Sequence, residues 1–145
     1  MAESLTGACA CKAIQYECTA EPAFSWKCHC RDCQRASGSM LCPVMYVPKT
    51  ALTISGEAKF YEVKAESGNG VRRGFCSNCG CPVFIDADLV PDLMGLWAAS
   101  LNDPNQFSAQ VEVWTSSAQN WTCLEPELEK FSHAPTSDQM TKILT

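Results

Sequence analysis

The feature that most constrains this chain is the placement of its cysteines, which fall into short-spaced groups along 145 residues. The sequence contains 11 cysteines, and its first residues lack the basic and then apolar pattern of a secretory signal. An odd number of cysteines without such a signal argues against a complete disulfide framework. In a reducing compartment, cysteines at these spacings are more typical of metal ligands. We therefore expect a cytoplasmic protein whose fold includes thiolate metal sites.

The first group combines Cys9 and Cys11, a C-x-C pair, with Cys76 and Cys79, a C-x₂-C pair that is followed by Gly80. Zinc in structural sites prefers a closed tetrahedron of four ligands, which two such pairs can supply. Closing the loop of roughly 65 residues between them costs about 3.7 kcal/mol plus a constant. A structural zinc contributes on the order of 10–16 kcal/mol. These four cysteines are thus predicted to bind a structural zinc. Iron in the same geometry, a disulfide or ordinary buried thiols are the alternatives.

The second group is Cys28, Cys30 and Cys33, in a C-H-C-x₂-C run. On an extended segment Cys28 and Cys30 point to the same side and His29 to the other, and a following turn can bring Cys33 back to them. Three thiolates leave one position vacant, as in catalytic zinc sites, and an incoming thiol bound there would be deprotonated. Three alternatives stay open: His29 as a fourth ligand, a redox pair of Cys30 and Cys33, and a metal-free reactive cluster.

Short apolar or alternating runs separated by turn residues predict a mainly β sandwich or open barrel. The expected strands are 6–9, 13–17, 24–28, 41–47, 52–55, 60–64, 71–76, 83–86, 93–98 and 110–115. Short helices are expected at 32–36, 125–131 and 139–144. We expect a single domain over residues 1–145 with its core at about 5–135, and a loosely held tail after Pro135.

The composition excludes some classes of function. A hydrophobic fraction of 46% and a charged fraction of 19% are those of a globular chain, and no apolar run is long enough to span a membrane. The net charge is −5, and the 11 basic residues are scattered, which argues against binding to nucleic acid phosphates. The densest basic pair, Arg72-Arg73, is predicted to be a solvated strand edge. Cys42, within an apolar run, is predicted to be a core residue.

The order of these motifs resembles that of the glutathione-dependent formaldehyde-activating enzymes, whose relatives include the zinc domain of centromere protein V. Three motifs in sequence carry the resemblance: G-x-C-x-C at Gly7 to Cys11, C-H-C-x₂-C at Cys28 to Cys33, and F-C-x₂-C-G at Phe75 to Gly80. The similarity extends from Gly7 to about Pro135. It implies a β-tent fold of stacked antiparallel sheets. It also implies structural zinc on the first group of cysteines and catalytic zinc on the second.

The resemblance further implies a carbon–sulfur lyase-type activity, the joining of glutathione and formaldehyde into S-hydroxymethylglutathione. Zinc would hold the glutathione sulfur as a thiolate for attack on the aldehyde. His29, Asp32 and Arg35 are candidates for moving protons or binding the glutathione carboxylates. The second hypothesis is a non-catalytic zinc module that binds a thiol ligand or a protein partner. Two zinc ions per chain are expected, the second more labile, and self-association into a homo-oligomer stays open.

Overall fold

The computed structural model describes residues 3–145, so Met1 and Ala2 of the predicted domain lie outside the described residues. β-strands are the main regular structure of the described residues, which also form two short α-helices. The strands are β1 (Leu5–Ala8), β2 (Gln15–Cys18), β3 (Phe24–Cys28), β4 (Cys42–Pro48), β5 (Leu52–Ser55), β6 (Ala58–Lys64), β7 (Gly70–Cys76), β8 (Pro82–Ala87), β9 (Leu93–Trp97), β10 (Val111–Val113) and β11 (Glu129–Lys130). The helices are α1 (Arg31–Ser37) and α2 (Ser137–Leu144).

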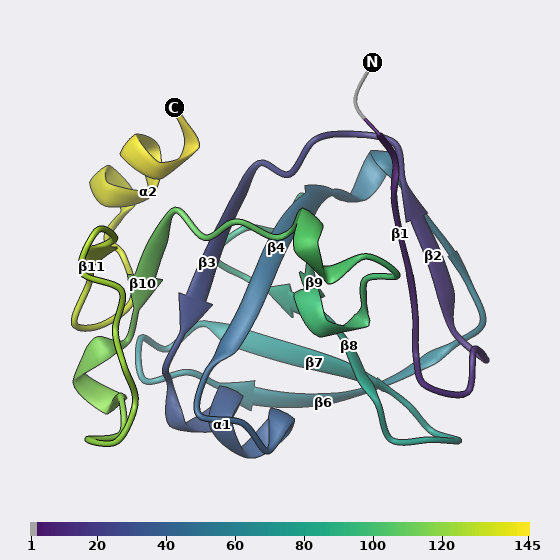
Figure 1. Ribbon diagram of the computed structural model, residues 1–145, viewed down its shortest axis with the longest axis horizontal. Coiled ribbons are helices and arrows are strands. Elements are labelled where there is room, and N and C mark those ends of the chain that lie inside the picture. The colour runs from purple at the N-terminus through teal and green to yellow at the C-terminus, as the bar shows by residue number, and fades with distance from the viewer. Residues whose placement is uncertain (1–2) are drawn as a thin grey trace.

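The strands form two sheets (Figure 1). The large sheet has the order β11-β10-β3-β4-β9-β8-β7-β6, and the small sheet has the order β1-β2-β5. Neighbouring strands are antiparallel except at β10, which runs parallel to both β3 and β11. The predicted mainly β, tent-like arrangement of sheets is therefore confirmed.

The large sheet carries a hydrophobic core on each face, and strand β4 contributes to both. Successive side chains of a strand point to opposite faces. Accordingly, Val44 and Tyr46 pack in one core with Cys28 and Cys33, whereas Val47 packs in the other. That other core also contains Cys9 and Cys76. The two groups of cysteines consequently lie against opposite faces of the large sheet.

Gly7 of the G-x-C-x-C motif is required by close packing of β1 against β2 and against the 3-10 turn Ala98–Ser100 that follows β9. The Tyr16 hydroxyl makes a 2.7 Å hydrogen bond with Ser100 Oγ next to this glycine. A Cβ atom at position 7 would lie 2.2 Å from the phenol of Tyr16 and 2.6 Å from the carbonyl oxygen of Ser100. Because one of these obstacles is backbone, a larger residue would force β1 away from this turn.

Two predictions for the C-terminal part were wrong. The segment 125–131 is not a helix: it is extended, and β11 pairs with β10 while the Phe131 amide donates to the Glu112 carbonyl. Backbone groups of this segment therefore find partners in the sheet.

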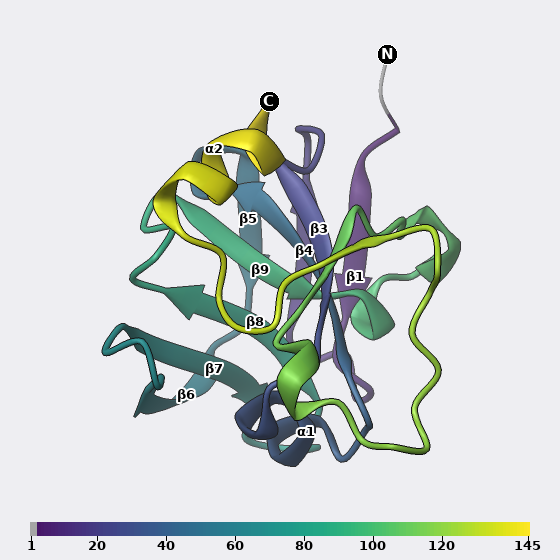
Figure 2. The ribbon, with the colours of Figure 1, turned by 90° about the vertical axis from the view of Figure 1, so that its left-hand side faces the viewer.

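The tail after Pro135 is not loosely held either. It begins α2 with a capping box between Thr136 and Gln139. Met140 and Ile143 of this helix are buried in the same core as Cys28. Figure 2 shows the chain after β10 passing around this side of the large sheet to α2. Within residues 3–145, no helix is long and apolar enough to cross a membrane.

Candidate metal centres

The first group of cysteines is brought together at the ends of distant strands. Cys9 directly follows β1 and Cys76 ends β7, and the four ligand sulfurs of Cys9, Cys11, Cys76 and Cys79 all lie within 4.8 Å of one another. The Sγ atom of Cys11 is 3.7 Å from that of Cys9 and 3.7 Å from that of Cys76. Gly80, in the turn after the second pair, has a φ of 75°, a conformation that glycine adopts without strain. The set has the number and type of ligands of a closed zinc site.

Hydrogen bonds lower the pKa values of Cys11 and Cys79 in this group, whereas the pKa of Cys76 is raised to about 11. The pKa of Cys11 is lowered to about 6, first by a hydrogen bond from the Asn78 side chain and then by one from the Ala13 backbone. The Ile14 amide also donates to Cys9 Sγ, at 3.3 Å. Because thiolates are the form that binds metal, these turns suit a cation at the centre of the group.

The second group forms where β3 passes into α1. Cys28 is the last residue of β3, Cys30 is the N-cap of α1, and Cys33 lies in its first turn. Their sulfurs lie within 4.8 Å of one another. The Cys33 amide donates to Cys30 Sγ at 3.2 Å, so that Cys30 also caps the helix. Cys28 and Cys33 are buried, whereas Cys30 is only partly buried.

The thiols of this group depend on one another. The pKa of Cys33 is held well below its ordinary value, chiefly by hydrogen bonds from Cys28 and Cys30 and then from Cys42. The attraction of the Arg73 guanidinium adds to this effect. The pKa of Cys28 is raised, first by its hydrogen bonds with Cys30 and Cys33, in which Cys28 is the donor, and then by burial. Cys42 is a fully buried core residue, as predicted, and lies against the group without joining it.

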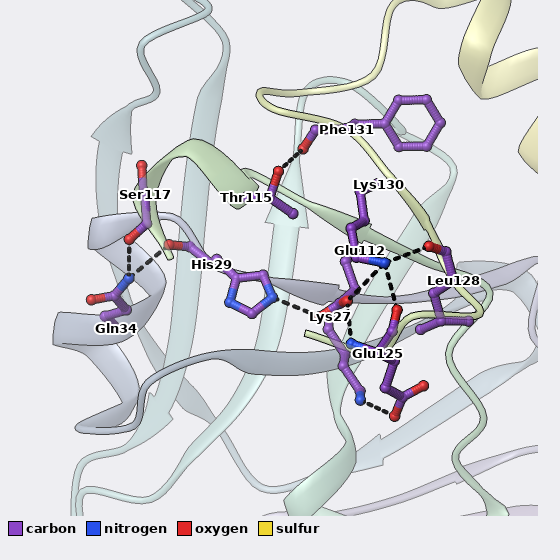
Figure 3. A network of polar contacts seen from close by, with 10 residues as sticks. All are labelled: Lys27, His29, Gln34, Glu112, Thr115, Ser117, Glu125, Leu128, Lys130 and Phe131. Carbon is purple, nitrogen blue, oxygen red and sulfur yellow. Dashed lines mark hydrogen bonds and ion pairs between the residues drawn. The ribbon is translucent and has the colours of Figure 1, made fainter. Parts of the chain in front are cut away.

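The His29 side chain points towards Glu112 (Figure 3) and does not belong to the group of three sulfurs, as the alternation of an extended segment predicts. Its side chain is fully buried, and Nε2 donates to the Glu112 carboxylate at 2.9 Å. Glu112 also accepts from the Glu125 amide at 2.9 Å, and Lys130 Nζ lies 3.9 Å away. The alternative in which His29 completes the metal site is therefore wrong, because its ring faces β10 instead.

Gln34 of α1 also holds the segment that carries the three cysteines, through hydrogen bonds of its side chain. Its side-chain amide donates to the carbonyls of His29 and Ser117, at 2.7 Å and 3.0 Å (Figure 3). It accepts a hydrogen bond of 2.8 Å from the Gln119 side chain. The segment that carries Cys28, Cys30 and Cys33 is thus hydrogen-bonded to β10 through His29, and to the chain after β10 through Gln34.

A cavity of about 210 Å³ opens over the second group. Its walls are largely apolar, and Trp26 and Trp114 both contribute to them. Leu89 and Val90, from the segment after β8, also line it. No cavity of this kind is associated with the first group among the described pockets.

Arg73 is the site residue that sequence reasoning missed. It was predicted to lie on a solvated strand edge, but β7 is an inner strand of the large sheet and Arg73 lines the cavity. Its Nη2 atom is 3.3 Å from Cys33 Sγ and 3.7 Å from Cys30 Sγ. Arg72 points the other way and binds Asp86 and Asp88. The alternation of β7 was the available signal, since adjacent arginines on an inner strand must face opposite sides.

Asp32 and Arg35, the other candidates named from the sequence, are exposed on α1. Both line a second cavity of about 440 Å³ between α1 and the β6–β7 hairpin. Asp32 and Arg73 line both cavities. The structure therefore brings these residues near the second group of cysteines, without a hydrogen bond from Asp32 or Arg35 to the sulfurs among the described residues.

Residues 4–117 match the family described as glutathione-dependent formaldehyde-activating enzyme. Since this is most of the chain, the protein belongs to that family. A crystal structure of a Rhodobacter sphaeroides protein superposes with a TM-score of 0.54 at 19% identity, and covers 70% of this chain and 93% of that one. This likeness concerns the fold. None of the curated proteins compared with the chain matches it.

Both groups of sulfurs fit a metal ion by the chemistry of their donors. Four thiols within 4.8 Å in one group and three in the other match the closed and open arrangements of cysteine-ligated zinc. The chain is thus a member of the family with two cysteine clusters that could bind metal ions.

Proposed function

We propose that the chain is a zinc-dependent carbon–sulfur lyase-type enzyme that joins a thiol, with glutathione as the first candidate, to formaldehyde. The observation that carries this proposal is the cavity, which reaches the three-cysteine group but not the four-cysteine group. In this assignment Cys9, Cys11, Cys76 and Cys79 hold a structural zinc. Cys28, Cys30 and Cys33 hold a catalytic one.

The residues around the second group would prepare it for this chemistry. Bound there, zinc would supply a vacant position that stabilises a thiol as its thiolate. The apolar walls would exclude water and hold the sulfur and the aldehyde carbon together. The buried link from His29 to Glu112 keeps the ligand-bearing loop in place from behind. Cys30, the partly buried ligand, would face the incoming substrate.

The second candidate is a non-catalytic zinc module that binds a thiol without turning it over. The observation in its favour is that the side chain hydrogen-bonded to the sulfurs of Cys30 and Cys33 is that of Arg73, a guanidinium that does not give up its proton. The two candidates differ in turnover, and they agree in the metal and thiol sites.

The test is the Cys30→Ser variant, compared with wild type and with Cys123→Ser, an exposed cysteine outside both groups. Serine is a good N-cap, so α1 keeps its cap while the zinc site loses one thiolate. We expect two zinc ions per wild-type chain by elemental analysis and one in Cys30→Ser. Adduct formation from glutathione and formaldehyde is measured above the spontaneous reaction by a rapid assay.

Loss of the catalysed rate in Cys30→Ser alone, with an unchanged melting temperature, supports the enzyme. Metal and thiol binding in the wild type without any rate above background would support the binding module. A catalysed rate that persists after loss of the second metal would refute the open-site mechanism.

A further inference from the structure

Arg73 is a half-buried cation that forms no ion pair with a carboxylate within 4 Å among the described residues. Its Nε atom is buried and makes no hydrogen bond, and its Nη2 atom contacts only the sulfurs of Cys30 and Cys33 among its described polar partners. Among residues 3–145, none of the ion pairs within 4 Å includes Arg73. Partial burial of a guanidinium is costly unless negative charge lies nearby, and the sulfurs of Cys33 and Cys30, together with Asp32, are the groups that favour the charged form of Arg73.

The charge of Arg73 is less screened by solvent than the other charges that line the cavity. Four charged residues line the cavity, and three of them, Arg31, Asp32 and Glu66, are exposed to solvent. Arg73 is the one that is not exposed. Charges interact more strongly where solvent and its screening are absent. Among the four charged residues, Arg73 is therefore the one least screened by solvent, and its Nη2 atom contacts two of the three sulfurs.

A charge count connects this residue to the proposed open metal site. Three thiolates around a divalent cation carry one net negative charge, which the guanidinium of Arg73 balances. A fourth thiolate would add a further negative charge to a largely apolar cavity. Without Arg73, a fourth thiolate would change the net charge of the group from −1 to −2. With Arg73 included, the same ligand changes the net charge from 0 to −1.

We propose that Arg73 is a positioning residue that makes the open metal site selective for an anionic fourth ligand, a thiolate, over a neutral one. This inference rests on the proposed function in so far as it needs a metal on Cys28, Cys30 and Cys33. Arg73 acts through its hydrogen bonds to Cys30 and Cys33 and through its charge. Its side chain thereby determines what class of ligand the cavity accepts.

The experiment uses the full chain loaded with cobalt(II), whose absorption reports the ligands around the metal. Wild type, Arg73→Met and Arg73→Lys are titrated with glutathione as the anionic ligand and with imidazole as the neutral one. Arg72→Met is the matched control, because it removes the same charge from the adjacent residue, which faces Asp86 and Asp88. Cobalt stoichiometry and melting temperature are recorded for each variant.

We expect Arg73→Met to lose at least tenfold in glutathione affinity, about 1.4 kcal/mol, while its imidazole affinity changes by less than threefold. Arg73→Lys should recover much of the glutathione affinity because it restores the charge. Arg72→Met should match the wild type in both titrations.

Three results would overturn the inference. These are an unchanged glutathione affinity in Arg73→Met, an equal loss for glutathione and imidazole, and a failure of Arg73→Met to load two cobalt ions. The last would mean that Arg73 supports the metal itself rather than the choice of fourth ligand. A wild type that loads no metal on the second group would instead refute the proposed function, so the two failures can be told apart.

Discussion

The buried pair of His29 and Glu112 offers a sharp test of how the ligand-bearing loop is held. Both side chains are fully buried, and the Glu112 carboxylate accepts hydrogen bonds from His29 Nε2 and from the Glu125 amide. The Glu112→Ala substitution would leave both donors without a partner in the interior. Each unsatisfied buried group costs about 1–3 kcal/mol, and breaking a buried pair costs about 3–5 kcal/mol in total.

For a domain of this size, a loss of 1 kcal/mol lowers the melting temperature by roughly 2–4 °C. We therefore expect Glu112→Ala to melt roughly 10 °C below the wild type, measured by circular dichroism on the metal-loaded protein. Because His29 lies between Cys28 and Cys30, the variant should also release the second metal to a chelator faster than the wild type does.

Glu62→Ala is the matched control, because Glu62 is 61% exposed and pairs with Arg72 at the surface. Exposed pairs of this kind contribute about 1 kcal/mol or less, so this variant should melt within a few degrees of the wild type. Equal melting temperatures for Glu112→Ala and Glu62→Ala would refute the argument that the buried pair holds the loop.

Two further predictions concern stability. Cys76→Ser should unfold the domain or lower its melting temperature by far more than Cys81→Ser does. The reason is that a structural zinc contributes on the order of 10–16 kcal/mol and that Cys81 lies outside the group of four ligands. Thermal melting of both variants checks this, and a Cys76→Ser protein that melts like the wild type would contradict it. Burial raises the pKa of Tyr16 to about 12 against an opposing hydrogen bond with Ser100. The stabilisation from keeping this phenol neutral is therefore complete below about pH 10 and is lost as the pH rises towards about 12, by about 3 kcal/mol in all. Urea unfolding at pH 8 and pH 11 should show a smaller loss in Tyr16→Phe than in the wild type, and equal losses would mean that Tyr16 does not titrate in this range.

Much of the fold could be predicted because the local signals agreed with the tertiary environment. The strands β3 and β5 have the predicted bounds, and the other strands predicted up to β10 differ from theirs by a few residues at their ends. Where the prediction failed, at 125–131, the deciding partner was distant in sequence. Glu112 of β10 accepts hydrogen bonds from this segment. A pattern within residues 125–131 cannot predict these bonds, because the acceptor lies elsewhere in the sequence.

Cysteine spacing alone identified the two groups of sulfurs that the structure brings within 4.8 Å. Short spacings place the ligands of one pair on one turn, whereas the meeting of Cys9 and Cys11 with Cys76 and Cys79 depends on how the ends of β1 and β7 lie. The surroundings of both groups depend on the tertiary fold as well. The cavity, the burial of His29 against Glu112, and the approach of Arg73 to Cys30 and Cys33 each join residues from separate strands. Those contacts depend on how the strands are ordered in the large sheet, which spacing along the chain does not encode.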